Sequence, residues 1–324
     1  MDTKDKLLKY CSSIGLDKIG FCRCRIFKEL EQYYQFKKDK GFFNEFEEKD
    51  IEKKINPFVY MKEGRTIISV AFPYNFINED NPSKVAFSMY CQGEDYHRVI
   101  SFYLEKVCSF IKELGGKAEF FVDSNSLPEV YIASLSGIGF IGKNNLLITK
   151  EYGSYIFLGE IITDLYLEEN MKIQESCREC NLCLKACPTA SITSNNHNTC
   201  LSYLTQKKEL SLDEMIKIKG SLFGCDICQR VCPNNTDVKA SNIKEFQPLD
   251  YMFSPDLEEL INLDNRSFIK YKRSSCSWRG KNLLIRNALI NYMLLYKEKL
   301  VFMEATKSPY IKHCYYRLLE ILKL

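Results

Sequence analysis

The order of apolar and polar residues divides the chain into three parts. Over residues 1–170, two stretches with apolar positions at helical spacing, 1–13 and 96–114, alternate with short runs rich in β-branched and aromatic residues. We expect three of these runs to form strands: Thr66–Phe72, Lys117–Val122 and Tyr155–Thr163. Residues 171–240 lack long apolar runs, and helical spacing returns in 280–297 and 308–324. The pattern predicts a domain of mixed helices and strands over 1–170, a different kind of segment over 171–240 and a helical segment over 241–324.

The composition is typical of a globular protein. The 324 residues suffice for two domains, and 45% of them are hydrophobic and 27% charged. No apolar run approaches the roughly 18 residues of a membrane helix, and the charged start MDTKDKLLKYC lacks a signal-peptide core. We therefore expect a cytoplasmic protein without a membrane partner.

Positive charge gathers in one short segment. The net charge of +3 is too small to predict nucleic-acid binding by itself, but five cations with two aromatic residues between them fall within twelve positions. The cations are Lys270, Lys272, Arg273, Arg279 and Lys281, and the aromatic residues are Tyr271 and Trp278. Such a segment is either a solvated face or a surface for phosphate groups.

The fifteen cysteines indicate metal or redox chemistry, because a chain of this size without an export signal has little use for disulfides. Seven are scattered and are expected to behave as small buried apolar residues. Eight lie within 56 residues: Cys177, Cys180, Cys183, Cys187, Cys200, Cys225, Cys228 and Cys232.

The spacing of these eight cysteines predicts two [4Fe–4S] clusters. Residues 177–188 form C-x2-C-x2-C-x3-C-P, the bacterial ferredoxin run, in which three thiolates bind one cluster and the fourth binds the other. The second run, 225–233, lacks one cysteine, which Cys200 can supply. The predicted sets are Cys177, Cys180, Cys183 and Cys232 for one cluster, and Cys187, Cys200, Cys225 and Cys228 for the other.

Structural zinc is the alternative interpretation of paired C-x2-C units. Zinc does not require the four-cysteine run or the C-P endings, so we favour the clusters. Two clusters form an electron path and perform no chemistry on a substrate themselves. We therefore expect a second redox centre in the N-terminal domain.

Other motifs of the N-terminal part carry weaker signals. Gly137, Gly139 and Gly142 spell G-x-G-x-x-G, but the preceding residues favour a helix where a nucleotide-binding strand is required. We expect these glycines to serve a tight turn and a close backbone approach. The corrinoid motif D-x-H-x-x-G is absent around His97, which we interpret as a structural residue.

At this point the sequence resembles the epoxyqueuosine reductases, cobalamin and iron–sulfur enzymes that complete queuosine in tRNA. The resemblance runs over nearly the whole chain. It rests on GEDYH, VDS, GIGFIGKN, EYGSYIFLGEI, the two cysteine runs, CLSYLTQ and WRGKNLLIRNA, which begin at residues 93, 122, 137, 151, 177, 223, 200 and 278 in the order motif by motif with the cysteine runs at 177 and 223.

The resemblance implies a fold, a partner and a set of site residues. It implies a nitroreductase-like cobalamin-binding α/β domain over 1–170, a ferredoxin-like domain with two [4Fe–4S] clusters over 171–240, and a shortened HEAT-like helical segment over 241–324. It places the catalytic aspartate at Asp123 and the cobalamin-facing positions at Lys54, Ser88, Leu147, Leu158, Ser202 and Asp226, with Asp123 also facing the cofactor. It further implies contacts of Lys208 and the 270–281 segment with tRNA, an unidentified low-potential electron donor, and a monomer.

The implied reaction removes the epoxide oxygen of epoxyqueuosine in two electrons, with Asp123 as proton donor. Asp123 ends an apolar strand, where a carboxyl group is expected to be half-buried with a raised pKa. From the residues alone, a helix N-cap ahead of Pro128 was the simpler interpretation of this aspartate.

Some positions depart from the family pattern. Met89 and Cys91 stand in S-M-Y-C where relatives have S-R-Y-A, and Leu135 stands where they carry arginine. A reductive dehalogenase and a ferredoxin-type electron carrier remain alternative functions. The first normally carries a twin-arginine export signal, and the second would bind no cobalamin.

Overall fold

The computed structural model describes residues 2–76, 83–177 and 179–324. These residues fold as two compact units, each assembled from three segments of the chain. Unit 1 comprises Met1–Asn75, His97–Ala186 and Cys228–Lys244, and unit 2 comprises Phe76–Tyr96, Cys187–Ile227 and Glu245–Leu324. The division into 1–170, 171–240 and 241–324 therefore stays a prediction.

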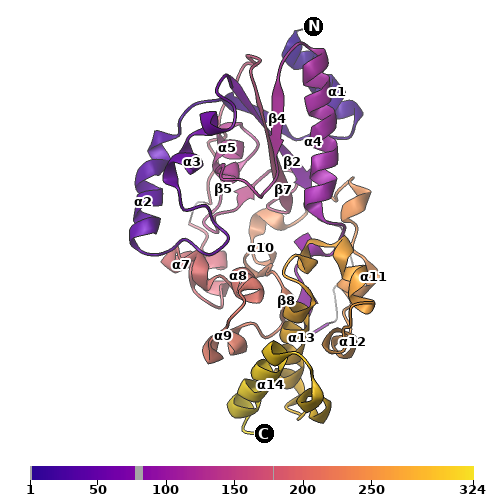
Figure 1. Cartoon of the computed structure of the whole chain (residues 1–324). Coiled ribbons are helices and arrows are strands. Elements are labelled where there is room, and N and C mark those ends of the chain that lie inside the picture. The colour runs from indigo at the N-terminus through magenta and orange to yellow at the C-terminus, as the bar shows by residue number, and fades with distance from the viewer. Residues whose placement is uncertain (1, 77–82, 178) are drawn as a thin grey trace. The chain divides into compact units, whose positions relative to one another are not determined.

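Unit 1 is built on a four-stranded antiparallel sheet with the order β1-β2-β7-β4 (Figure 1). Residues of β2 are buried throughout, because the sheet is covered on both faces. The elements of this unit are α1 (Thr3–Ser13), β1 (Ile19–Arg23), α2 (Glu31–Asp39), α3 (Ile51–Ile55), β2 (Thr66–Pro73), α4 (Tyr96–Glu113), β4 (Ala118–Phe121), α5 (Glu129–Leu135), β5 (Phe140–Ile141), β6 (Leu147–Ile148), β7 (Ile156–Thr163), α6 (Leu182–Ala186) and α10 (Ile227–Arg230).

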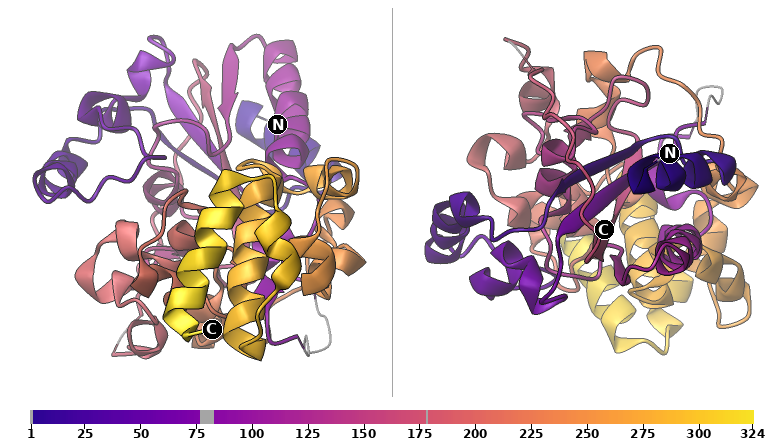
Figure 2. Two further views of the ribbon diagram at one scale, coloured as in Figure 1. Left: turned by 60° about the horizontal axis from the view of Figure 1, so that its bottom comes forward. Right: turned by 90° about the horizontal axis from the view of Figure 1, so that it is seen from above.

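Helices α1 and α4 lie side by side along the sheet (Figure 2), and Tyr10 stacks on Phe110 at 4.2 Å between ring centres. Helix α4 approaches β7 at Gly159, where an added Cβ would lie 2.7 Å from a methyl group of Leu104. The opposite face of the sheet carries α5, whose Ile132 and Ala133 pack against side chains of β1, β2 and β7. Alternate residues of β7 thus face α4 and α5.

Unit 2 is organised around the C-terminal helix pair. Helix α13 (Lys281–Tyr296) is buried on nearly all sides, and α14 (Pro309–Leu322) packs beside it (Figure 2). The short strands β3 (Ala86–Phe87) and β8 (Ser221–Phe223) pair in parallel and pack on α13. The remaining elements are α7 (Ser191–Ser194), α8 (Leu201–Gln206), α9 (Leu212–Lys217), α11 (Asp250–Phe253) and α12 (Leu257–Ile261).

The helices and strands expected from periodicity are all present, with ends shifted by one to three residues. The mixed fold is thus confirmed, and its main sheet is antiparallel. Strand β1 was not expected, because its five residues, IGFCR, are too few to show a pattern. In the described part of the chain, every helix is too short or too polar to span a lipid bilayer.

The glycines of the G-x-G-x-x-G run serve a turn and a close backbone approach, as expected. Gly137 has a φ of +73°, and a Cβ at Gly139 would lie 2.3 Å from the carbonyl oxygen of Ile148. The preceding residues form α5 and not a strand, so the segment is not a nucleotide-binding turn.

Candidate functional site

Four of the predicted cluster ligands surround one cavity of unit 1. Cys177, Cys180, Cys183 and Cys232 line a space of ≈ 510 Å³. Cys183 lies on α6, and Cys232 precedes the short turn Pro233–Asn235. Among the described residues, no three His, Cys, Asp or Glu side chains converge closely enough to hold a single metal ion. Sulfurs that surround a space without converging on one point suit a four-iron cube better than a zinc ion.

Lys143 closes one side of this cavity. Its backbone N–H donates to Sγ of Cys177 at 3.3 Å, and its ammonium donates to the carbonyl oxygen of Cys180 at 2.9 Å and to Oδ1 of Asn181 at 2.8 Å. An N–H bond and a positive charge next to a thiolate ligand stabilise added negative charge on a cluster. The sequence did not assign this role, because Lys143 lies 34 residues before Cys177.

Three ligands of the second predicted set lie together in unit 2. Burial raises the pKa of Cys225 to about 12, and the neighbouring Cys200 and Cys187 raise it further. At Cys187, burial opposes ionisation, but backbone N–H groups at the start of α7 and the Thr189 hydroxyl bring the net pKa below its ordinary value. The fourth predicted ligand, Cys228, lies on α10 at the start of a unit 1 segment, and its membership of this set stays a prediction.

Asp123 lies in the loop that follows β4, and its position differs from the expectation. Its side chain is 58% exposed, so the expected half-buried carboxyl group is not found. Its Oδ2 atom lies 3.1 Å from Nε2 of His97, the first full residue of α4 in unit 1. Helix α5 begins with Pro128 at its N-cap, so Asp123 does not cap that helix. His97 was interpreted as a structural residue, whereas it contacts the candidate proton donor.

The raised pKa expected at Asp123 occurs instead at a neighbouring acid. Glu129, the first residue of α5, accepts hydrogen bonds at Oε1 from the backbone N–H of Asp123 (2.9 Å) and from Nδ2 of Asn125 (2.8 Å). Burial, followed by repulsion from Asp123, raises the pKa of Glu129 to about 7. Sequence reasoning missed this residue, whose one local sign is a glutamate directly after Pro128.

Behind Glu129 lies a second buried acid, Glu160, in the middle of β7. Its Oε1 accepts from the Ser69 hydroxyl at 3.1 Å, and its Oε2 has no hydrogen-bond partner. Burial, with Glu129 nearby, raises the pKa of Glu160 well above its ordinary value. The signal in the sequence was a single acid in the apolar run IFLGEIIT.

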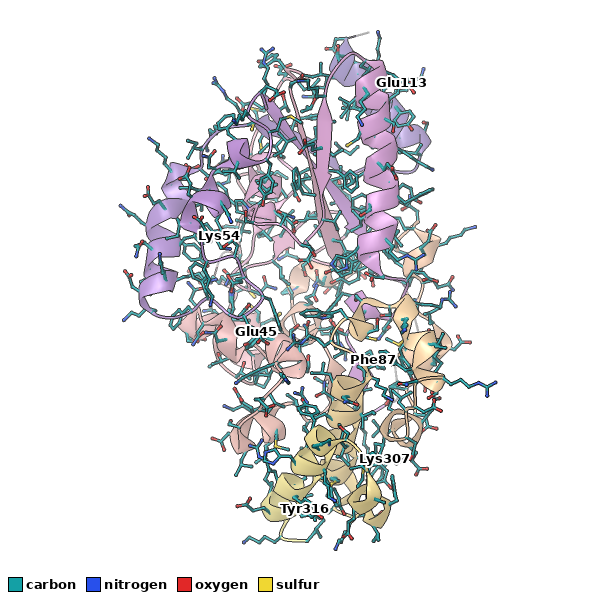
Figure 3. All side chains as sticks on the ribbon, in the orientation of Figure 1. Glu45, Lys54, Phe87, Glu113, Lys307 and Tyr316 are labelled. Atoms are coloured by element: carbon teal, nitrogen blue, oxygen red, sulfur yellow. The ribbon has the colours of Figure 1, made fainter. Side chains whose placement is uncertain are left out.

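The positions implied to face cobalamin fall into two groups. In unit 1, Leu147 and the half-buried Leu158 pack with Ala71 and Ala133, and Lys54 lies on α3 beside α2 (Figure 3). The Lys54 ammonium is 4.9 Å from the Tyr34 ring centre and 5.4 Å from that of Phe43, and burial lowers its pKa.

In unit 2, the other implied positions are joined by hydrogen bonds. Asp226 accepts from the Ser88 hydroxyl and, at 2.8 Å, from the backbone N–H of Met89. Ser202 on α8 hydrogen-bonds the buried Tyr90 hydroxyl. The structure thus brings Ser88 and Asp226 into contact.

The basic segment is partly neutralised. Lys270 forms an ion pair with Glu259 at 2.5 Å, and Arg273 forms one with Glu94. The guanidinium of Arg279 lies 5.0 Å from the ring centre of Trp278, which is 54% exposed, and the Trp278 Nε1 donates to Gln206 at 3.1 Å. The five cations are therefore not equivalent as phosphate contacts.

Two cysteine sets of this kind, joined to an antiparallel sheet domain, define an iron–sulfur redox protein. Residues 176–235 match the family model described as "4Fe-4S double cluster binding domain", and residues 54–124 match "Epoxyqueuosine reductase QueG, DUF1730". The predicted pair of [4Fe–4S] clusters is thereby confirmed.

Full-length relatives agree with this class. The epoxyqueuosine reductase of Lactococcus garvieae (strain Lg2) is 35% identical over 298 residues, which cover 88% of this chain and 85% of that protein. The Bacillus subtilis epoxyqueuosine reductase, in a structure with its catalytic aspartate loop swung out of the active site, superposes with a TM-score of 0.90 at 31% identity and covers 98% of this chain and 90% of that one. An epoxyqueuosine reductase in complex with an epoxyqueuosine-modified tRNA-Tyr stem loop gives a TM-score of 0.89 at 29% identity and covers 99% of both chains. The chain belongs to the epoxyqueuosine reductase family, whose members are oxidoreductases.

Proposed function

We propose that this protein reduces epoxyqueuosine to queuosine at the wobble position of tRNA. The epoxide takes up two electrons and two protons, the carbon–carbon double bond forms, and the oxygen leaves as water. The observation that carries the proposal is the similarity, over 99% of both chains, to the family member that holds an epoxyqueuosine-modified stem loop.

The eight cysteines supply the electron path of this proposal. Cys177, Cys180, Cys183 and Cys232 hold one cluster, and Cys187, Cys200, Cys225 and Cys228 hold the other. Each cluster passes one electron at a time, so two transfers serve one turnover. An external low-potential donor reloads the clusters.

Cobalamin is the proposed reductant of the epoxide. The partly exposed apolar side chains of Leu158, Ile156 and Val130 suit the face of a corrin ring, and the ammonium of Lys54 and the hydroxyl groups of Ser88 and Ser202 suit its amide groups. When bound, cobalamin supplies a strongly reducing cobalt centre. Because Nε2 of His97 is engaged with Asp123, no axial histidine is assigned.

Asp123 is the proposed proton donor to the departing oxygen. Its exposed carboxyl group can reach a bound substrate, and His97 and the Glu129 hydrogen bond hold it in one orientation. The family member whose catalytic aspartate loop swings out of its active site supports an aspartate on a loop in this role.

The tRNA anticodon loop is the proposed partner surface for the basic segment. A nucleoside at the wobble position must leave the stack to enter a reaction pocket, so the backbone on either side needs cationic contacts. Lys208, Lys272 and Lys281 are candidates, and Trp278 offers an exposed ring. We propose a cytoplasmic monomer.

The deciding experiment analyses the product directly. Anaerobically reconstituted protein with cobalamin is incubated with epoxyqueuosine-containing tRNA and a low-potential reductant, and the nucleosides are separated by mass. Loss of one oxygen from the modified nucleoside is expected. An unchanged nucleoside in the presence of reduced clusters and bound cobalamin would contradict the proposed function.

A further inference from the structure

The loop that carries Asp123 is tied to Glu129. One carboxyl oxygen of Glu129 accepts from the backbone N–H of Asp123 itself and from the side chain of Asn125. Asn125 in turn accepts from the backbone N–H of Leu127 at 2.7 Å. Asp123 has a φ of +50°, which costs free energy for a residue other than glycine, so the loop needs such external contacts to keep this shape.

The far end of the loop is held separately. The Ser126 hydroxyl donates to the carbonyl oxygen of Lys53 at 2.8 Å, and the Ser126 backbone N–H donates to the Tyr60 hydroxyl at 2.9 Å. Loss of the Glu129 contacts would therefore free the Asp123 end while the Ser126 end stays attached.

Glu129 also lies among other ionisable groups. Asp123 and His97 face it from the loop and from α4, and Glu160 faces it from β7. Asp123 and Glu160 disfavour a negative charge on Glu129, and His97 favours one. Neighbouring carboxyl groups that repel each other retain protons to higher pH than an isolated one does.

We propose that Glu129 is a positioning residue for Asp123, with two separable effects: its Oε1 atom fixes the backbone of the loop, and its negative charge favours retention of a proton by Asp123. The first effect aims the proton donor. The second keeps it loaded at neutral pH. The inference rests on the proposed role of Asp123 as proton donor.

Two substitutions separate these effects. Glu129→Ala removes both the acceptor and the charge. Glu129→Gln keeps a carbonyl oxygen that can accept the same two hydrogen bonds but removes the charge. Glu119→Gln, an exposed position on β4, is the matched control.

The first measurement is hydrogen–deuterium exchange of the peptide covering residues 122–128, in holoprotein without turnover. Exchange in Glu129→Ala should be roughly fivefold or more faster than in the parent, because hydrogen bonds to a charged acceptor are lost. Glu129→Gln and Glu119→Gln should stay within about twofold, because the acceptor remains or was never involved. Unchanged exchange in Glu129→Ala would overturn the positioning effect, and this result does not depend on whether the protein acts on epoxyqueuosine.

The second measurement is the pH dependence of the single-turnover rate with modified tRNA stem loop. A rate that needs protonated Asp123 falls as pH rises. Without the Glu129 charge, Asp123 loses its proton at lower pH, so this fall should move to lower pH by roughly one unit in Glu129→Gln, with the KM for the stem loop unchanged. A profile identical to that of Glu119→Gln would overturn the effect on the proton. Absence of turnover in the parent protein would instead contradict the proposed function.

Discussion

Asp123 combines an exposed carboxyl group with a constrained backbone. Its carboxylate contacts His97, its N–H donates to Glu129, and its φ lies in the left-handed region. Aspartate tolerates this region better than most residues with a side chain, because its short polar group can bond locally. The environment therefore fixes direction more than it buries the acid.

Asp123→Asn should lower the deoxygenation rate by about a hundredfold or more, because the amide occupies the same space but cannot donate an acidic proton. The absorbance of the clusters and of bound cobalamin should stay unchanged. Asp164→Asn, at the other end of the β4–β7 pair, provides the control. Near-normal turnover in Asp123→Asn would remove the assigned role.

Glu160 makes the stability of the protein depend on pH. Its folded-state pKa is raised above the ordinary value of 4.5, so the folded protein holds this proton more tightly than the unfolded chain does. The contribution of Glu160 to stability is therefore greatest at low pH and falls as pH rises through and beyond this ordinary value.

Glu160→Gln removes this pH-dependent cost. The difference in thermal unfolding midpoint between the variant and the parent should be more positive at pH 8 than at pH 5. The comparison uses differential scanning calorimetry of both proteins in the same metal-loaded state, with Glu119→Gln as control. A difference that is equal at the two pH values would show that Glu160 is not protonated preferentially in the folded state.

At the scale of elements, helix α13 organises unit 2 through polar side chains as well as apolar ones. The buried Arg286 guanidinium donates to the carbonyl oxygens of Thr205, at the end of α8, and Lys207, just beyond it. Asn287 donates from Nδ2 to the carbonyl oxygens of Thr205 (2.8 Å) and Leu222 (2.7 Å). One helix thus satisfies backbone groups that α8 and β8 leave unpaired.

Asn287→Ala should lower the free energy of unfolding by about 2–4 kcal/mol, because two buried carbonyl oxygens lose their donor. Asn282→Ala, an exposed position on the same helix, should change it by no more than about 0.5 kcal/mol. Thermal unfolding midpoints of the two variants measure the contrast. Equal midpoints would mean that the buried amide contributes no more than an exposed one.

At the scale of the whole molecule, the proposed tRNA contact depends on which cations are available. Lys270 is paired with Glu259, whereas Lys272, two residues later, is exposed. A phosphate that contacts Lys270 must compete with a carboxylate, and this lowers the gain from that contact.

Lys272→Gln should weaken binding of a tRNA anticodon stem loop and reduce the slope of log Kd against log salt by roughly one. Lys270→Gln should change the slope less. Fluorescence titration of the single tryptophan, Trp278, at several salt concentrations provides the measurement. Equal effects of the two substitutions would show that the ion pair with Glu259 does not limit Lys270.

Local patterns in the sequence determined much of this protein. Helix and strand periods located the expected elements, because apolar spacing follows the geometry of each. The cysteine spacings predicted two clusters, because neighbouring ligands of one cluster lie a few residues apart. Lys54, Ser88 and the other cobalamin-facing positions came from the family resemblance, and their roles stay predictions.

The tertiary structure alone decided which distant residues meet. Glu129 and Glu160 come together because α5 packs on the face of the sheet toward which alternate residues of β7 point, and no local pattern encodes that packing. Lys143 reaches Cys177, and Glu259 neutralises Lys270, in the same way. Burial and pairing depend on the whole surroundings of a side chain, and for that reason the sequence predicted Asp123 as the buried acid where the fold buries Glu129.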